Sequence, residues 1–144
     1  MGSTTVEFPD GIRVRGRGLG RPRPAEPEPD FGLYLGTSKL RRKHGGGLTW
    51  PHEWITWPDF LLPRDSEAAR RQIRNLHERA KSETVEVACY GGAGRTGTVM
   101  ACLAVLSGVP ADEAVAWTRR HYHERAVETP WQRGWVKKFA RQLD

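Results

Sequence analysis

Cys89-Tyr90-Gly91-Gly92-Ala93-Gly94-Arg95-Thr96 is a glycine-rich stretch that separates two segments of opposite character. Residues 84–88 before it alternate β-branched and polar side chains, which is typical of a strand. Residues 96–106 after it are largely apolar, which is typical of a buried helix. The sequence therefore predicts a strand that ends at Cys89, a tight loop, and a helix that begins near Arg95.

This strand–loop–helix arrangement predicts a binding site for a phosphate dianion. Backbone N–H groups of such a loop converge on a concavity, and the start of the helix adds partial positive charge. Cys89 at the floor would feel the same field, which stabilises a thiolate. Arg95 can hold two phosphate oxygens with its planar guanidinium. The residues expected to surround the phosphate are Tyr90, Gly91, Gly92, Ala93, Gly94 and Arg95.

The sequence of this loop is compatible with three classes of protein. Gly92 to Gly97 fits the dinucleotide fingerprint G-x-G-x-x-G, but too little chain follows for that fold. The acids that come next, Asp112 and Glu113, follow a Gly-Val-Pro break without a strand between. The nucleoside-triphosphate loop nearly fits, but Thr98 stands where its lysine must be. The third class, a cysteine-dependent phosphatase, needs only the cysteine and the arginine.

Two further segments favour the phosphatase. In Trp57-Pro58-Asp59 the aspartate lies on a proline-bounded loop between aromatic residues, which suits a movable general acid, although Pro-Asp also favours an ordinary turn. Thr129-x-x-Gln132 is a capping box with Pro130 at the first helical position. A capped helix start also determines where Gln132 points.

Together the three segments resemble the protein tyrosine phosphatase superfamily, whose tyrosine-specific branch carries W-P-D, C-x5-R-[ST] and Q-T-x-x-Q in this order. The resemblance covers roughly residues 31–139, and 33–36 also resembles a strand of the compact dual-specificity branch. Two residues depart from the pattern. Ala88 replaces the usual His before the cysteine, and Glu128 replaces the first Gln of the third motif.

The resemblance implies catalysis without a metal or another cofactor. Cys89 would attack phosphorus to give a cysteinyl-phosphate, with Arg95 and the loop N–H groups stabilising the transition state. Asp59 would protonate the leaving oxygen, and in the second step accept a proton from water. Gln132 would position that water by likeness to the family's second Gln, and the Thr96 hydroxyl would hydrogen-bond the departing thiolate.

The loop interior carries no charge, which argues against highly phosphorylated inositols, and the W-P-D and T-x-x-Q motifs favour phosphotyrosine. A dual-specificity or small-molecule phosphatase is the alternative, and a catalytically silent phosphate-binding module is the alternative from another class. Trp50, Trp54 and Tyr90 could wall a pocket for an aryl ring, while Trp50 and Trp54 could equally be core. The expected partner is a phosphorylated protein or a small phosphomonoester.

With 144 residues the chain is expected to form a single phosphatase-like domain over 1–144, in which 1–30 are a hairpin and a Pro/Gly-rich loop. The predicted class is α/β, a small, central, partly parallel sheet flanked by helices. Two cysteines are too few for a disulfide framework, and Cys102 is predicted to be a core thiol. No signal region or membrane span is evident in the sequence, so a cytoplasmic, non-membrane protein is expected.

The chain carries a net charge of +6, with arginines concentrated near 13–23 and further basic residues at Arg41-Arg42-Lys43. These basic residues form either a solvated face or a surface that attracts acidic or phosphorylated partners. Nucleic acid is not the expected partner, because no base-reading motif is present. His121-x-His123-Glu124 is the cluster nearest to a metal site, and it is better explained as the end of a helix.

Periodicity and turn residues divide the remaining chain into further elements. A hairpin is expected around Pro9-Asp10-Gly11, and strands over 31–36 and 53–57. A basic turn is expected over 39–47. Helices are predicted over 66–81, from Pro110 onward, and over 130–143.

Overall fold

The sheet begins with the expected hairpin. In the computed structural model, which describes residues 3–143, β1 (Ser3–Glu7) pairs antiparallel with β2 (Arg13–Gly18), and Val6 lies opposite Val14. The three other strands are β3 (Phe31–Gly36), β4 (His52–Thr56) and β5 (Val85–Cys89). The strand order is β1-β2-β5-β3-β4, and every pair except β1–β2 is parallel. Four strands therefore end at one edge of the sheet, where Cys89 lies, and open α/β sheets bind ligands at that edge.

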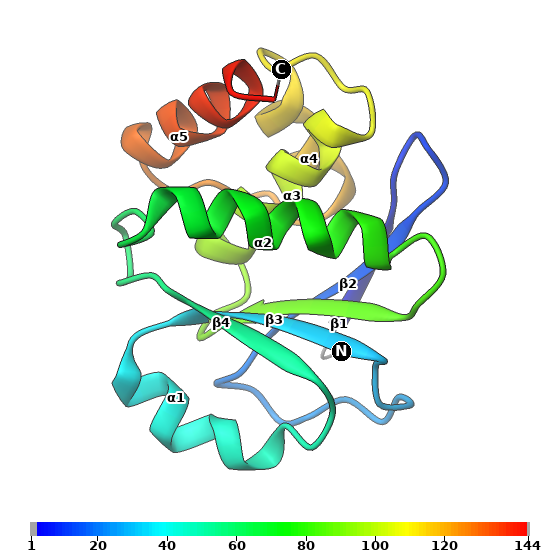
Figure 1. Ribbon diagram of the computed structural model, residues 1–144, viewed down its shortest axis with the longest axis vertical. Helices are drawn as coiled ribbons and strands as arrows, with labels where there is room; N and C mark the ends of the chain where they lie inside the picture. The colour runs from blue at the N-terminus through cyan, green and yellow to red at the C-terminus, as the bar shows by residue number, and fades with distance from the viewer. Residues whose placement is uncertain (1–2, 144) are drawn as a thin grey trace.

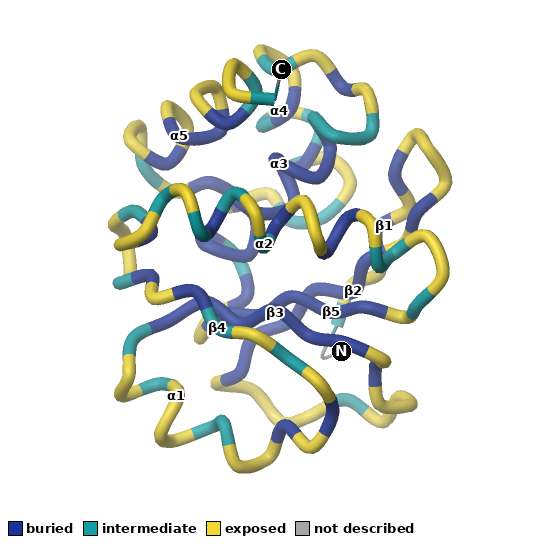
Figure 2. The backbone as a smooth tube through the Cα atoms, viewed as in Figure 1, coloured by how far each residue is buried: buried dark blue, intermediate teal, exposed yellow. Residues whose placement is uncertain are grey.

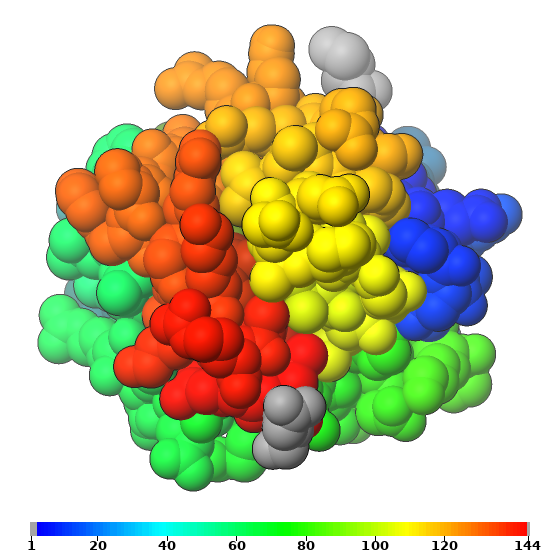
Figure 3. Space-filling model, turned by 90° about the horizontal axis from the view of Figure 1, so that it is seen from above, coloured from blue at the N-terminus to red at the C-terminus, as the bar shows by residue number. Residues whose placement is uncertain are grey.

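Helices cover both faces of the sheet, as expected for the α/β class (Figure 1). One face carries α2 (Ser66–Arg79), α3 (Gly94–Leu106), α4 (Ala114–His121) and α5 (Pro130–Arg141). The other carries α1 (Ser38–His44) and the 3-10 turn η1 (Gly45–Gly47). Seen from above, α4 (yellow) and α5 (orange to red) lie side by side as the outer layer (Figure 3). Within residues 3–143, no helix combines the length and the apolar character that crossing a bilayer requires.

Two local predictions were wrong. The expected basic turn over 39–47 is helical. The sequence did not indicate this helix, because α1 buries none of its residues and so shows no apolar period. Its last turn holds Arg41, Arg42, Lys43 and His44, and basic side chains there suit the negative end of a helix. The helix expected from Pro110 begins at Ala114, after a turn in which Glu113 N–H donates to the Pro110 carbonyl.

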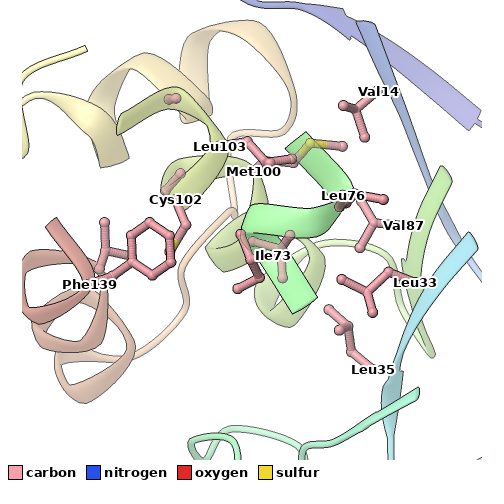
Figure 4. Packing of buried hydrophobic residues seen from close by; sticks show 14 of the residues in the cluster. Val14, Leu33, Leu35, Ile73, Leu76, Val87, Met100, Cys102, Leu103 and Phe139 are labelled. Carbon is pink, nitrogen blue, oxygen red and sulfur yellow. The ribbon is translucent and has the colours of Figure 1, made fainter. Parts of the chain in front are cut away.

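The main core lies between the sheet and α3. Residues 94–104 of this helix are all buried, so α3 is dark along nearly its whole length in Figure 2. Met100 and Leu103 share one cluster with Val87 and with Ile73 of α2 (Figure 4). Cys102 belongs to the same cluster, and burial raises the pKa of its thiol. The prediction that Cys102 is a packed core thiol is confirmed.

A second apolar cluster lies on the opposite face of the sheet. It consists of Leu19, Tyr34, Leu48, Trp50 and Ala88, with Trp54 packed against it. The Trp50 indole N–H donates to the Tyr34 hydroxyl at 2.7 Å. Trp50 is therefore core, and the suggestion that it walls a substrate pocket was wrong. The same cluster surrounds the small Ala88 side chain, so an imidazole at this position would need additional space.

A buried ion network lies beside this second cluster. Glu86 of β5 accepts hydrogen bonds from Arg17 at 2.8 and 3.1 Å and from the Tyr34 hydroxyl at 2.6 Å. The Arg15 guanidinium lies 3.4 Å from the same carboxylate. Arg15 and Arg17 are both buried, so these two arginines do not belong to a solvated basic face. Instead they join β2 to Glu86 of β5, the strand that ends at Cys89.

We expect Glu86→Gln to destabilise the fold strongly. The substitution keeps the shape of the side chain but leaves Arg17 buried without its counter-charge, which typically costs about 3–5 kcal/mol. Urea denaturation measures the free energy of unfolding. Glu53→Gln on the exposed part of β4 is the control and should change it by less than about 0.5 kcal/mol. Equal stability of the two variants would mean that the network does not hold β2 and β5 together.

Candidate active site

Cys89 is the last residue of β5, and its sulfur lies at the floor of the glycine-rich loop. The Gly92 N–H points at Sγ, with nitrogen and sulfur 3.2 Å apart. Gly92 has a φ of +81°, and a Cβ there would lie 2.7 Å from the backbone of Arg17 and Gly18. Only glycine tolerates both the positive φ and the close backbone contact. Glycine at position 92 therefore allows the Gly92 N–H to turn toward the sulfur.

The glycine-rich loop leads directly into α3, which begins at Gly94. The residue before the helix, Ala93, makes no side-chain capping hydrogen bond, so the first N–H groups of the helix are left for a ligand. A helix N-terminus of this kind attracts anions. The prediction of a strand, a loop and a helix is confirmed, with the helix beginning at Gly94.

Arg95 and Thr96 bring unused polar atoms to the same place. The buried Arg95 guanidinium donates to the Trp57 carbonyl at 2.9 Å, while its Nε has no hydrogen-bond partner within the described residues. The Thr96 hydroxyl is also buried and lacks a partner there. Unpaired buried groups are costly and therefore rare in folded proteins. A tetrahedral oxyanion above Cys89 would give Arg95 Nε its missing partner.

The loop that carries Asp59 is anchored next to Arg95. Trp57 is fully buried, and its indole N–H donates to the Leu61 carbonyl at 2.8 Å. The same ring packs on Trp135 of α5, with centroids 5.7 Å apart. Asp59 itself is more than half exposed, and its Oδ1 lies 3.6 Å from Arg95 Nε. The structure thus brings Asp59, Arg95 and the cysteine loop together.

The first turn of α5 holds the other side of this loop. Thr129 caps the helix by accepting a hydrogen bond from Gln132 N–H at 3.1 Å, as the capping-box pattern predicts. The buried Gln132 carboxamide accepts from Glu128 N–H at 2.9 Å and donates to the Leu61 carbonyl at 3.2 Å. The Trp131 indole donates to the Phe60 carbonyl. Gln132 is therefore tied to the loop that carries Asp59.

Tyr122 is a residue of the site that sequence reasoning missed. Its hydroxyl donates a hydrogen bond to the carbonyl of Gly92, on the outer side of the loop. Burial, together with the nearby Cys89 charge, raises its pKa well above the usual range. Tyr122 follows the last turn of α4 and lies far from the loop in the sequence, so only the folded chain shows this contact.

The exposed apolar side chains gather around the same site. Large side chains with about half of their surface exposed are Phe60, Leu61, Tyr90 and Trp131. Two of them follow Asp59 directly, one belongs to the cysteine loop, and Trp131 donates to the Phe60 carbonyl. These four residues form the apolar rim of the site. In residues 3–143, no group of three or more His, Cys, Asp or Glu is placed to hold a metal ion, the cluster at 121–124 included.

Comparison with known proteins agrees with this geometry. A family model described as PTP-SAK, "Swiss Army Knife protein, DSP-PTPase phosphatase domain", matches residues 61–141, more than half of the chain. The chain therefore belongs to this family of dual-specificity-like phosphatase domains. An uncharacterized protein of Methanocaldococcus jannaschii is 42% identical over 60 residues, which cover 42% of this chain and 36% of that protein. The match thus spans about a third of the curated relative.

Solved structures extend the likeness to almost the whole chain. The active form of Tk-PTP superposes with a TM-score of 0.71 at 26% identity, over 96% of this chain and 97% of that one. Kinase associated phosphatase, solved with its catalytic-site cysteine replaced by serine, gives a TM-score of 0.76 at 14% identity over 98% and 94% of the two chains. At that identity only the fold is comparable. The resemblance to the tyrosine phosphatase superfamily is confirmed.

Proposed function

We propose that this protein hydrolyses phosphomonoesters through a cysteinyl-phosphate, with phosphotyrosine in a protein as its substrate. The observation that carries the proposal is the meeting of Cys89, Arg95 and Asp59 at the uncapped start of α3. A nucleophile, an oxyanion partner and a proton donor on three different segments are what phosphoryl transfer requires.

In the first step the Cys89 thiolate attacks phosphorus, and the bond from phosphorus to the leaving oxygen breaks. Asp59 transfers its proton to that oxygen. Arg95 Nε, which has no hydrogen-bond partner in the described residues, and the N–H groups of residues 90–94 bind the equatorial oxygens. This step leaves the phosphoryl group on sulfur and releases the alcohol or phenol.

In the second step water attacks the cysteinyl-phosphate, and the sulfur–phosphorus bond breaks. Asp59, now ionised, accepts a proton from the water. We assign the positioning of this water to Gln132, which Leu61 connects to the loop of Asp59. The buried Thr96 hydroxyl, free of other partners in residues 3–143, donates to the departing thiolate.

The apolar rim supports an aryl ester over an alkyl one. A phosphotyrosine ring entering the loop would pass between Tyr90 and the Phe60–Leu61 pair, whose side chains are half exposed. Burial of aromatic surface, and offset contact between rings, would stabilise that complex. A phosphoserine side chain has no ring with which to contact the rim while its phosphate lies on Cys89.

The direct test measures phosphate release from a phosphotyrosine peptide, its phosphoserine counterpart and an aryl phosphate. We expect faster turnover of the two aryl esters, resistance to a chelator, and loss of turnover after thiol alkylation. Equal rates on phosphotyrosine and phosphoserine would make the protein a dual-specificity enzyme. Tight binding of phosphotyrosine without release would make it a phosphate-binding module.

Tyr122→Phe tests the support behind the loop. The variant loses only the hydroxyl that donates to the Gly92 carbonyl. Because one hydrogen bond contributes about 0.5–1.5 kcal/mol, we expect kcat/KM on an aryl phosphate to fall roughly 3–10-fold. Tyr90→Phe is the matched control, because it also removes one hydroxyl but keeps the half-exposed ring of the apolar rim, and it should retain most activity. Equal losses in the two variants would argue against a positioning role for Tyr122.

A further inference from the structure

A basic hollow of about 410 Å³ lies beside the cysteine loop. It is open to solvent and is lined by residues 19–23, which follow β2, and by residues around the end of α1. Its charged or titratable lining residues are Arg17, Arg21, Arg23 and His44. None of the residues that line it is acidic. The hollow has the size of a small-molecule site and a strongly positive wall.

The positive charge of this wall is only partly compensated. Arg17 is neutralised by Glu86, and Arg23 lies 3.4 Å from Glu28 at the surface. Arg21 forms no ion pair with a carboxylate of the described residues, and it also lines the neighbouring hollow at Gly91 and Gly92. Arg21 therefore borders both hollows, the one at Gly91 and Gly92 and the basic one.

His44 adds an unpaired polar atom. It ends α1, where the helix dipole favours positive charge. Its Nε2 is buried and has no hydrogen-bond partner within residues 3–143. A buried nitrogen without a partner costs free energy that a bound oxygen would recover. In the hollow, such an oxygen would lie next to the arginines.

The hollow adjoins the place where a substrate phosphate would bind. Leu19 N–H donates to the Cys89 carbonyl at 2.8 Å and Gly20 N–H to the Tyr90 carbonyl at 2.9 Å. The Tyr90 ring packs on Gly20 so closely that a Cβ there would lie 2.6 Å from it. Arg21 therefore directly follows the residues that contact the cysteine loop.

We propose that Arg21, Arg23 and His44 form a second anion subsite, which binds a further anionic group of the substrate beside the phosphotyrosine. The inference rests on the proposed function and extends it to the substrate class. The cysteine loop offers a single cation, Arg95, which the first phosphate uses. A second negative group must therefore be neutralised outside the loop, and this hollow lies next to it. The group is a phosphoryl on a neighbouring side chain or a carboxylate.

The test uses binding, so that it does not depend on turnover. The Cys89→Ser protein is titrated calorimetrically with a phosphotyrosine peptide, and with versions carrying a phosphoserine or a glutamate at graded distances on either side. We expect about 10-fold tighter binding for at least one placement, the size of one hydrogen bond to a charged group. A gain with phosphoserine only identifies a second phosphoryl, and a gain with both identifies any acidic neighbour.

Arg21→Gln should remove this preference and leave the affinity for the singly phosphorylated peptide nearly unchanged. Arg42→Gln is the control, because it removes an exposed charge of α1 that does not line the hollow. The inference is overturned if no placement tightens binding, or if Arg42→Gln erases the preference equally. If the singly phosphorylated peptide itself does not bind, the proposed function fails rather than the subsite.

Discussion

Cys89→Ser is expected to abolish phosphate release while the protein still binds a phosphate analogue. The serine hydroxyl is a poor nucleophile beside a thiolate, and loss of a nucleophile in other hydrolases costs about 10⁴-fold or more. The binding groups, which are the loop N–H atoms and Arg95, remain in place. Phosphate release from an aryl phosphate measures the first effect, and calorimetric titration with inorganic phosphate measures the second.

Cys102→Ser is the matched control. Cys102 is buried in the core, away from the cysteine loop, and burial keeps its thiol protonated. Cys102→Ser should leave kcat nearly unchanged. A near-UV circular dichroism spectrum checks that the variant is folded. Substantial hydrolysis by the Cys89 variant, or an equal loss in a folded Cys102 variant, would mean that the nucleophile is wrongly assigned.

Asp59→Asn should affect substrates according to their leaving groups. An amide cannot give up a proton, and general acid catalysis contributes about 10²–10⁴-fold. We expect a loss of that size for an alkyl-substituted phenyl phosphate, whose phenolate leaves poorly. The loss should be much smaller for nitrophenyl phosphate, whose phenolate leaves without a proton. The ratio of kcat/KM on the two substrates measures the difference.

Asp65→Asn is the control for Asp59, and it also tests the nearest rival acid. The Asp65 carboxylate caps α2 by accepting a hydrogen bond from Ala68 N–H at 3.0 Å, and asparagine caps helices equally well. The variant should fold and retain its activity on both substrates. If Asp59→Asn slows both substrates equally, Asp59 is structural. If only Asp65→Asn shows the leaving-group contrast, Asp65 is the acid.

The sequence alone predicts the parts of this site that depend on local structure. The cysteine loop, its helix and the cap at Thr129 are each encoded within a few residues, and the structure has all three. The hairpin at residues 9–11 is local in the same sense. Each of these elements follows from turn chemistry, capping or hydrophobic period, which neighbouring residues decide.

Contacts between distant segments could not be predicted in this way. Nothing near Tyr122 indicates that its hydroxyl reaches Gly92, and nothing in the arginine-rich β2 distinguishes buried Arg17 from exposed Arg13. The first depends on how the chain after α4 packs beside the cysteine loop, and the second on which strands pair and on where Glu86 lies. Helix α1 was missed because it packs through few apolar side chains, so a periodic signal is absent.

The cysteinyl-phosphate mechanism is tested most directly by trapping the cysteinyl-phosphate intermediate. The protein is mixed with an aryl phosphate, quenched in acid within a single turnover, digested and analysed by mass spectrometry. We predict one added phosphoryl group on the peptide that contains Cys89, absent from the Cys89→Ser protein and accumulating in a variant of Gln132. Turnover of the same substrate with no phosphoryl group on that peptide at any quench time would contradict the cysteinyl-phosphate mechanism.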